Sequence, residues 1–403
     1  MRQLFKFEPM WSNTPLKDSY DVVIIGAGVH GLAIAYYLAQ EGVDNIAILE
    51  KGYIGCGNSG RNTAILRSNY RTPEGIPFYQ QSLKLYEELS ATLGYNVLFS
   101  QQGHLTLGHT DSSVNDLRVR AEANKVLNVE SRMIDPQEIK RLVPAIDISN
   151  RPRYKILGGL YHPPGGIIRH DAVIWGYARE VSRLGGEIHT HTEVQDLLVE
   201  KNRITAVQTN RGKIFTHKVV NATSGWCSTI SNMAGITLPV VSHPLQACVT
   251  EPLTPVLDKV IVSANLHVYI SQTPRGELVF GAEIDPYNSY SLRSTFPTLQ
   301  SIASHTLELF PDFSSARILR QWGGICDMTP DYCPIIGEVP DLDGFYLDVG
   351  WGTYGFKAGP VAGKCLAQLI ATGRPPEIIK PFSLSRFDKN QLVGERASAA
   401  VSH

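Results

Sequence analysis

Residues Asp21–Glu50 read DVVIIGAGVHGLAIAYYLAQEGVDNIAILE and contain three consecutive elements. The apolar run Asp21–Ile25 predicts a buried strand, and Asn45–Leu49 predicts a second one. Between them, Leu32–Gln40 has the apolar spacing of a helix. A strand, a glycine-rich turn, a helix and a second strand together predict one unit of a parallel sheet with a helix packed on it.

The turn between the first strand and the helix carries Gly26, Gly28 and Gly31, which form G-x-G-x-x-G. The first glycine permits a tight turn, the second lets a pyrophosphate approach the backbone, and the third lets the helix lie close to the strand. Glu50 ends the second strand, where a carboxylate can accept hydrogen bonds from a ribose. The alternative is a glycine-rich turn without a ligand, but the combination of these elements favours a dinucleotide site.

Composition narrows the class of protein further. The chain has 403 residues, which favours two domains, and its hydrophobic content of 43% can build a large core. A formal net charge of −1 is not the basic excess typical of nucleic-acid binding. We find no apolar run long enough to span a bilayer and no signal-peptide core at the N-terminus, so we expect a cytoplasmic protein.

The six cysteines form no C-x-x-C pair and, with the histidines, no spacing typical of a metal site, so we expect free thiols and no bound metal. The sequon Asn221–Thr223 lies at the end of an apolar strand, and we do not expect it to be glycosylated. Residues 1–20 have no periodicity and are expected to form an arm, free to lie on a neighbouring subunit.

Later segments alternate between two patterns. The first predicts nucleotide-domain elements: helices at 76–93 and 171–184, strands at 187–190, 204–209, 213–220 and 344–350, and a glycine-rich turn before a helix at 350–373. The second predicts an antiparallel domain, with strands at 105–107, 247–250, 268–271 and 278–282 and helices at 112–127 and 297–310. We therefore expect a mixed α+β and α/β protein, with a Rossmann-like domain (21–94, 151–230, 322–387), a substrate domain (95–150, 231–321) and a tail (388–403).

Several motifs resemble those of the glycine oxidase/D-amino-acid oxidase superfamily of FAD enzymes. They are the opening segment, VVNATSGW at 219–226 and GWGTYGFKAGPVAG at 350–363. More narrowly, GRNTAILRSNY, SHPLQA, RQWGGICDMTPDYCPIIG and KPFSLSRF resemble the β subunit of heterotetrameric sarcosine oxidases. The resemblance covers nearly the whole chain and implies a two-domain FAD-dependent amine oxidase fold.

The resemblance also implies the chemistry. A secondary amino acid would lose a hydride to FAD from the carbon next to nitrogen, and sarcosine (N-methylglycine) would give glycine and formaldehyde. The residues that this assigns to FAD are Gly26, Gly28, Val29, His30, Gly31, Glu50, Lys51, Asn58, Ser59, Arg61, Thr63, Val194, Gly225, Trp226, Gly352, Thr353, Gly355 and Phe356.

Arg67 and Lys357 match positions that bind the substrate carboxylate in sarcosine oxidases. Arginine suits a two-pronged grip on a carboxylate, and Lys357 lies in a turn expected to approach the flavin. The alternative is a surface arginine and a lysine that only packs its aliphatic stem. His267 and Tyr269 are candidates for the same site, although both are equally consistent with packing.

Two departures from the related oxidases concern the flavins. Gly324 stands where monomeric sarcosine oxidases carry the cysteine that attaches FAD, so we expect non-covalent FAD. His170 replaces the usual proline before a helix, and the matching histidine in heterotetrameric sarcosine oxidase carries covalent FMN. A neutral imidazole is required for that attachment, and a helix N-terminus favours the neutral form. The alternative is a structural histidine.

The resemblance thus predicts one subunit of an α, β, γ, δ complex, with FMN at the interface with the large subunit relaying electrons to oxygen and giving hydrogen peroxide. Two rivals stay open. One is a related dehydrogenase acting on N-methylglutamate or proline with another electron acceptor, and the other is a flavin-binding scaffold subunit without chemistry of its own.

Overall fold

The structure is a computed structural model that describes residues 9–263 and 265–395, apart from the side chains of residues 282 and 283. A six-stranded sheet with the order β18-β19-β12-β1-β2-β8 forms its nucleotide-binding half. Neighbouring strands are parallel except β18 against β19. Their bounds are Val22–Ile25 (β1), Ile46–Leu49 (β2), Glu187–His189 (β8), Val219–Asn221 (β12), Ile335–Glu338 (β18) and Phe345–Val349 (β19).

Helices cover this sheet because its strands are apolar on both faces, as the fully buried β1 illustrates. They are α1 (Val29–Gln40), α2 (Gly75–Thr92), α5 (His170–Arg183), α6 (Cys227–Met233) and α8 (Gly359–Thr372). Two glycines let α8 pack closely on α1. A Cβ at Gly363 would lie 2.6 Å from the Cβ of Ala33, and one at Gly359 would lie 2.7 Å from Val29. The predicted helices of this half are confirmed to within a few residues.

A three-stranded sheet contains β9 (Val194–Glu200), β10 (Arg203–Thr209) and β11 (Gly212–Phe215). The single strand predicted over 213–220 is wrong, because the chain turns between Phe215 and Val219. Phe215 pairs with β10, whereas Val219 pairs with β1 in the six-stranded sheet. The Thr216 hydroxyl accepts a hydrogen bond from the Lys218 N–H at 3.2 Å and stabilises this turn.

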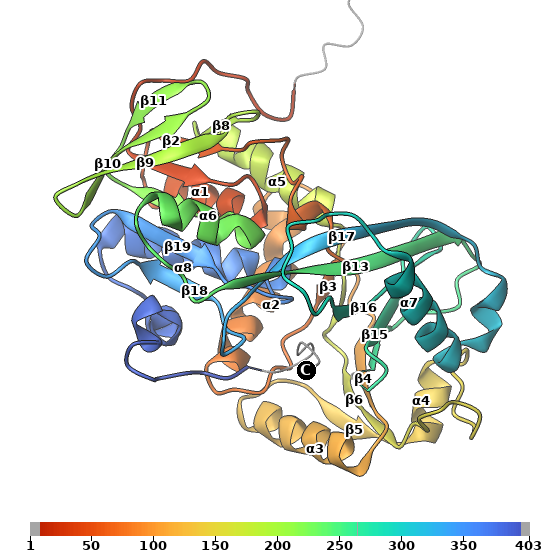
Figure 1. The fold of residues 1–403 in the computed structure, drawn as a ribbon. Helices are drawn as coiled ribbons and strands as arrows, with labels where there is room; N and C mark the ends of the chain where they lie inside the picture. Colours follow the sequence, from red (N-terminus) through yellow and green to blue (C-terminus); the bar gives the residue numbers. More distant parts are fainter. Residues whose placement is uncertain (1–8, 264, 396–403) are drawn as a thin grey trace, which may run out of the picture.

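An eight-stranded sheet with the order β17-β13-β16-β15-β14-β4-β6-β5 forms the second half, and β13 and β17 run side by side from one half into the other (Figure 1). Its neighbours are antiparallel except β14 and β4. The strands are β4 (His104–Gly108), β5 (Arg132–Ile134), β6 (Gly158–His162), β13 (Val241–Pro252), β14 (Val260–Ser263), β15 (Val268–Gln272), β16 (Glu277–Ile284) and β17 (Ile318–Met328).

Three α-helices accompany the second half, namely α3 (Asp111–Val126), α4 (Pro136–Leu142) and α7 (Phe296–Leu309). The remaining short elements are β3 (Ile65–Leu66), β7 (Gly166–Ile167), η1 (Asn58–Gly60), η2 (Ser224–Trp226), η3 (Pro311–Ser315), η4 (Phe356–Ala358), η5 (Glu377–Phe382) and η6 (Leu384–Arg386). The predicted fold class and the second antiparallel half are confirmed. The exact domain boundaries stay a prediction. In the eight-stranded sheet, β6 lies outside 95–150 and 231–321, and β17 continues beyond residue 321.

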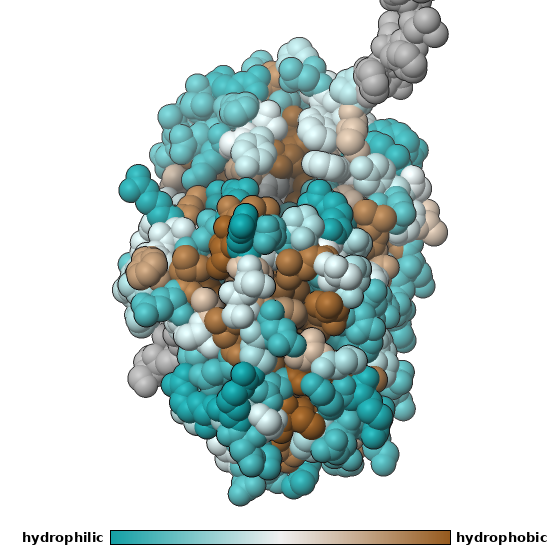
Figure 2. Space-filling model, turned by 90° about the vertical axis from the view of Figure 1, so that its right-hand side faces the viewer, coloured by the Kyte–Doolittle hydropathy of each residue, from teal (hydrophilic) through white to brown (hydrophobic). Residues whose placement is uncertain are grey.

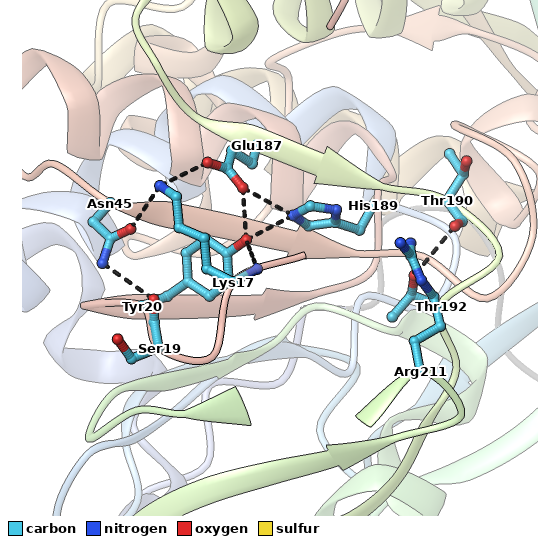
Figure 3. Close-up of polar contacts among 9 residues, drawn as sticks. All are labelled: Lys17, Ser19, Tyr20, Asn45, Glu187, His189, Thr190, Thr192 and Arg211. Atoms are coloured by element: carbon cyan, nitrogen blue, oxygen red, sulfur yellow. Dashed lines mark hydrogen bonds and ion pairs between the residues drawn. The ribbon is translucent and has the colours of Figure 1, made fainter. Parts of the chain in front are cut away.

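The described end of the N-terminal arm packs on its own chain. Lys17 Nζ lies 2.7 Å from Glu187 Oε1, and the Tyr20 hydroxyl donates to Glu187 Oε2 at 2.6 Å and lies 2.9 Å from His189 Nε2 (Figure 3). These contacts tie residues 17–20 to the edge strand β8. The first eight residues of the predicted arm, and residues 396–403 of the predicted tail, lie outside the described residues.

The surface is mixed in character. Figure 2 shows hydrophobic side chains gathered through the centre of one face, between regions of hydrophilic side chains. Within residues 9–263 and 265–395, every helix is too short or too polar to cross a membrane.

Candidate active site

Each glycine of the G-x-G-x-x-G turn occupies a position without room for a side chain. Gly26 has a φ of +108°, and a Cβ there would lie 2.7 Å from the Ala222 carbonyl oxygen. A Cβ at Gly28 would lie 2.9 Å from Ser59 Oγ, and one at Gly31 would lie 1.9 Å from the Gly26 oxygen. The backbone is therefore bare at the N-terminus of α1, where the Val29 N–H donates to Ser59 Oγ at 2.9 Å and the positive end of the helix dipole favours a phosphate.

Glu50 lies at the end of β2, where the sequence predicts it. Its carboxylate accepts hydrogen bonds from the Ala27 N–H at 3.0 Å and from the Gly52 N–H at 2.8 Å. The Cys56 thiol lies 3.4 Å from the same carboxylate. The side chain is thus held in one orientation beside the glycine turn, with lone pairs left for a ribose hydroxyl.

A cavity of about 550 Å³ runs from this turn to the eight-stranded sheet. It is lined by both predicted carboxylate-binding residues, Arg67 and Lys357, and by most of the residues predicted to hold the cofactor: Gly26, Gly28, Val29, His30, Glu50, Lys51, Asn58, Ser59, Arg61, Thr63, Val194, Trp226, Gly352, Thr353, Gly355 and Phe356. Segments from four distant parts of the chain therefore meet at one cavity.

Three residues of the predicted set do not line the cavity. Gly31 and Gly225 act through close packing, since a Cβ at Gly225 would lie 2.5 Å from Ile325 Cγ2. His170 is the first residue of α5 and half-buried, away from the cavity lining. Burial lowers the pKa of His170, which favours the neutral imidazole.

The loop after Glu50 is held against β17. Asn58 Oδ1 accepts a hydrogen bond from the Ile325 N–H at 2.9 Å, and its amide nitrogen donates to Ser224 Oγ at 2.8 Å. Trp322 Nε1 donates to the Arg61 carbonyl at 2.7 Å. A Cβ at Gly324 would lie 3.1 Å from Asn58 Oδ1, so this contact leaves little space for a larger residue.

His30 connects the glycine turn to the second glycine-rich loop. Its Nδ1 lies 2.9 Å from Asp348 Oδ2, and its Nε2 lies 2.8 Å from the Gly355 carbonyl oxygen. Burial lowers the pKa of His30, but the Asp348 carboxylate and the two hydrogen bonds outweigh burial, and the net shift is upward. Since both partners are acceptors, both ring nitrogens carry a proton and the side chain is an imidazolium.

The sequence interpretation missed Asp348. It lies in the otherwise apolar β19, and its Oδ1 also accepts from Trp351 Nε1 at 2.8 Å. The sequence did contain a signal for this role, namely a carboxylate inside an apolar strand. A buried carboxylate needs hydrogen-bond or charged partners.

Of the two predicted carboxylate-binding residues, Arg67 is buried and Lys357 is half-buried. Arg67 Nη1 donates to the Asn69 carbonyl at 3.2 Å and to Asn69 Oδ1 at 3.1 Å, and its guanidinium lies 4.4 Å from the Tyr70 ring centre. Lys357 Nζ donates to the Thr353 carbonyl at 3.3 Å. Burial, and then the charge of Arg67, lower the pKa of Lys357 to about 7. The burial of Arg67 does not match a surface arginine, whereas a lysine that only packs its aliphatic stem stays an open alternative for the half-buried Lys357.

Arg120 is a further buried cation that the sequence interpretation missed. From α3 it donates through Nε to the Asn69 carbonyl at 2.6 Å and through Nη2 to Asn69 Oδ1 at 2.9 Å. Arg67 and Arg120 therefore share one acceptor residue. The position of Arg120 on an amphipathic helix gave no signal of burial, since arginine on such a helix is ordinarily exposed.

One face of the eight-stranded sheet closes the cavity. Tyr269 pairs with Val262 on one side and Gly281 on the other, and Gly281 pairs with Ala247, so these positions share a face. A Cβ at Gly281 would lie 2.1 Å from the Tyr269 hydroxyl, which shows that the ring lies across the glycine. Tyr269 and His267 both line the cavity, as the sequence interpretation allowed.

Comparison with known proteins agrees with this architecture. Residues 21–369 match the DAO family, described as FAD dependent oxidoreductase. The chain is 45% identical to the sarcosine oxidase subunit beta of Arthrobacter sp over 98% of both chains. It is 43% identical to that of Rhodobacter capsulatus over 98% of this chain and 95% of the relative. A crystal structure of L-proline dehydrogenase from P. horikoshii is 28% identical and superposes with a TM-score of 0.88, covering 94% of this chain and 100% of the other.

Proposed function

The chain belongs to the FAD dependent oxidoreductase family, and from that premise we propose that it oxidises sarcosine, demethylating it to glycine and formaldehyde. The observation that carries the proposal is the presence of two cations, the buried Arg67 and the half-buried Lys357, in the lining of the cavity that begins at the glycine turn. A small amino acid needs its carboxylate bound at one end and its α-carbon held at the other. These two cations supply the first requirement.

The residues present fit FAD. None of the three glycines of the turn has space for a Cβ, and α1 begins directly after Gly28. The Ala27 and Gly52 N–H groups hold Glu50 in one orientation, which supports a role at the ribose, and Gly355, Phe356 and Arg67 line the same cavity. Bound there, FAD would supply the acceptor for a hydride from the carbon next to the amine nitrogen. Non-covalent binding fits the absence of a thiol at Gly324.

The protein's own part in the reaction is to bind, orient and exclude water. Arg67 offers a planar donor pair held by Asn69 and Tyr70, and Lys357 adds a point charge. Tyr269 and Val262 form an apolar cover over the cavity. Excluding water there strengthens the attraction between the two cations and a carboxylate.

We test the proposal by adding N-methylglycine, N-methylglutamate and proline separately to the FAD-loaded protein without oxygen. Bleaching of the flavin absorbance by N-methylglycine at the lowest concentration supports the proposal. Bleaching by none of the three would leave the scaffold rival standing, although the two cations that line the cavity argue against that rival.

Proline or N-methylglutamate oxidation is the second candidate. The L-proline dehydrogenase structure, with its TM-score of 0.88, is the observation that favours a related secondary-amine dehydrogenase. Preferential bleaching by proline would support it. Turnover with and without oxygen would separate an oxidase from an enzyme that uses another acceptor.

We further propose that His170 carries a covalent FMN, which would pass electrons onward to oxygen and give hydrogen peroxide. Its half-buried position at the start of α5 and its lowered pKa support a neutral, nucleophilic imidazole. The denatured chain should retain a flavin with the mass of FMN, and His170→Ala should lose it while keeping FAD and its reduction by substrate. Covalent flavin that persists in His170→Ala contradicts this assignment.

The proposed assembly is a heterotetramer in the cytoplasm, with α, γ and δ type subunits and the FMN at the interface with the large one. The name subunit beta of the relatives supports a multi-subunit enzyme. The six cysteines are free, which fits a reducing compartment. Size-exclusion chromatography after co-expression with neighbouring subunits, with His170→Ala as a comparison, would test the assembly.

A further inference from the structure

His104, at the start of β4, is buried beside the proposed substrate site with an incomplete set of hydrogen bonds. Its side chain is 2% exposed, and its Nδ1 has no hydrogen-bond partner among the described residues. It nevertheless lines the cavity together with Arg67 and Lys357. A buried polar atom without a partner costs about 1–3 kcal/mol, and at His104 a ligand bound in the cavity can supply the partner.

The position of the ring is fixed by its surroundings. His104 pairs with Val260 on β14 and with His162 on β6. A Cβ at Gly165 would lie only 2.6 Å from the His104 Cβ, so the strand is closely packed behind it. Residues two apart along a strand share a face, so His104 lies on the same face of β4 as Thr106. Their partners on β14, Val260 and Val262, likewise share one face.

The charged groups that face His104 keep it neutral. Arg67 comes from the loop after β3, Arg120 from α3 and Lys357 from the loop before α8, while His162 faces it from β6. Burial first, and then these positive groups, hold the pKa of His104 well below its ordinary value. His162 is neutral as well, because burial lowers its pKa to about 4. It is already bonded to the Glu130 carbonyl at 2.6 Å and to the Ser68 N–H at 3.2 Å.

We propose that His104 binds the amine end of the substrate by accepting a hydrogen bond from its N–H, while Arg67 and Lys357 bind the carboxylate. A neutral imidazole has one acceptor nitrogen, and every other polar group named in this cluster is a donor or is already paired. The inference rests on the proposed function and makes the site specific for amino acids that carry an N–H. Orienting that bond also fixes the direction of the nitrogen lone pair.

The test compares ligands that differ only at the nitrogen. N-methylglycine has an N–H, whereas butyrate carries a methylene and methoxyacetate an oxygen at the same position. The apparent Kd of N-methylglycine comes from anaerobic flavin reduction, and the Kd of each analogue comes from perturbation of the flavin spectrum. Proline and cyclopentanecarboxylate form a second pair of the same kind, for use if proline is the substrate.

His104→Phe keeps a ring but removes both nitrogens. We expect the Kd of N-methylglycine to rise about 2- to 12-fold, which corresponds to the loss of one neutral hydrogen bond. The Kd of butyrate and the Kd of methoxyacetate should each change less than about twofold. His104→Gln, with an amide oxygen as acceptor, should restore part of the loss. If His104→Phe fails to retain FAD, His104→Leu provides the same comparison.

Thr106→Val is the matched control. Thr106 lies on the same face of β4 and is 5% exposed, and its hydroxyl oxygen is buried without a partner in the described part of the chain, but it does not line the cavity. Its substitution should leave all three Kd values unchanged.

Equal weakening of N-methylglycine and butyrate binding by His104→Phe, or no weakening of either, overturns the inference, while wild-type reduction by N-methylglycine still supports the proposed function. A wild type reduced by proline alone overturns the proposed substrate, and the proline pair then decides the role of His104. A wild type reduced by neither amino acid overturns both.

Discussion

His30 and Asp348 form an ion pair across 318 residues of sequence, with 2.9 Å between Nδ1 and Oδ2. The pair joins the first turn of α1 to the end of β19. Both residues line the cavity, so their relative position decides the shape of the cofactor site.

Asp348→Asn should therefore lower both the stability of the protein and its affinity for FAD. The folded pKa of His30 is raised, so the stability that the pair contributes is fully present below the unfolded pKa of 6.5 and is lost as pH rises through the folded pKa. The difference in urea unfolding free energy between wild type and Asp348→Asn should be larger at pH 6 than at pH 9. A double-mutant cycle with His30→Gln should give a coupling of about 0.5–3 kcal/mol at pH 6. A difference that does not change with pH would contradict an imidazolium at His30.

Glu50→Ala should weaken FAD binding and leave the fold intact. A hydrogen bond to a charged acceptor contributes about 1.5–3 kcal/mol, so the Kd of FAD should rise by about one to two orders of magnitude. Fluorescence titration of the apoprotein with FAD measures this. Glu41→Ala removes an exposed acid just after α1 and should leave the Kd unchanged. Unaltered FAD affinity in Glu50→Ala would remove Glu50 from the ribose site.

Lys357→Met and Arg67→Ala should each slow flavin reduction and weaken binding of butyrate. The pKa of Lys357 is about 7, so its charge is present below that pH and lost above it. Butyrate affinity should fall as pH rises through about 7 in the wild type, and this dependence should vanish in Lys357→Met. Lys364→Met, at an exposed position of α8, is the control. Butyrate affinity that survives both substitutions would place the carboxylate elsewhere.

Tyr20→Phe should loosen the arm from β8. The Tyr20 hydroxyl donates to Glu187, and loss of a hydrogen bond to a charged group costs about 1.5–3 kcal/mol (Figure 3). Burial raises the pKa of Glu187, but hydrogen bonds from Lys17 and Tyr20 outweigh it and the net shift is downward. This stability is therefore present above the unfolded pKa of 4.5 and lost as pH falls through the folded value. Urea unfolding should show a smaller defect at pH 3 than at pH 7. Tyr53→Phe, at an exposed tyrosine, should show none at either pH.

Local sequence by itself determined the nucleotide-binding unit. The glycine spacing, the apolar strand and Glu50 lie within thirty residues. Each of them depends only on local backbone space and on the periodicity of nearby residues. The positions of Arg67 and Lys357 came from motif resemblance, and both line the cavity. The division into a nucleotide-binding half and an antiparallel half followed because strand and helix periods differ along the chain.

Only the tertiary structure decided which groups meet. The apolar stretch 213–220 divides between two sheets, because Phe215 pairs with β10 and Val219 with β1. Asp348 becomes the partner of His30, and Arg120 shares Asn69 with Arg67, through contacts between distant segments. The burial of His104, and the lack of a partner for its Nδ1 within residues 9–263 and 265–395, cannot be deduced from the neighbouring sequence. Burial, and the pKa shifts that follow from it, depend on what the whole fold packs around a side chain, which no local pattern encodes.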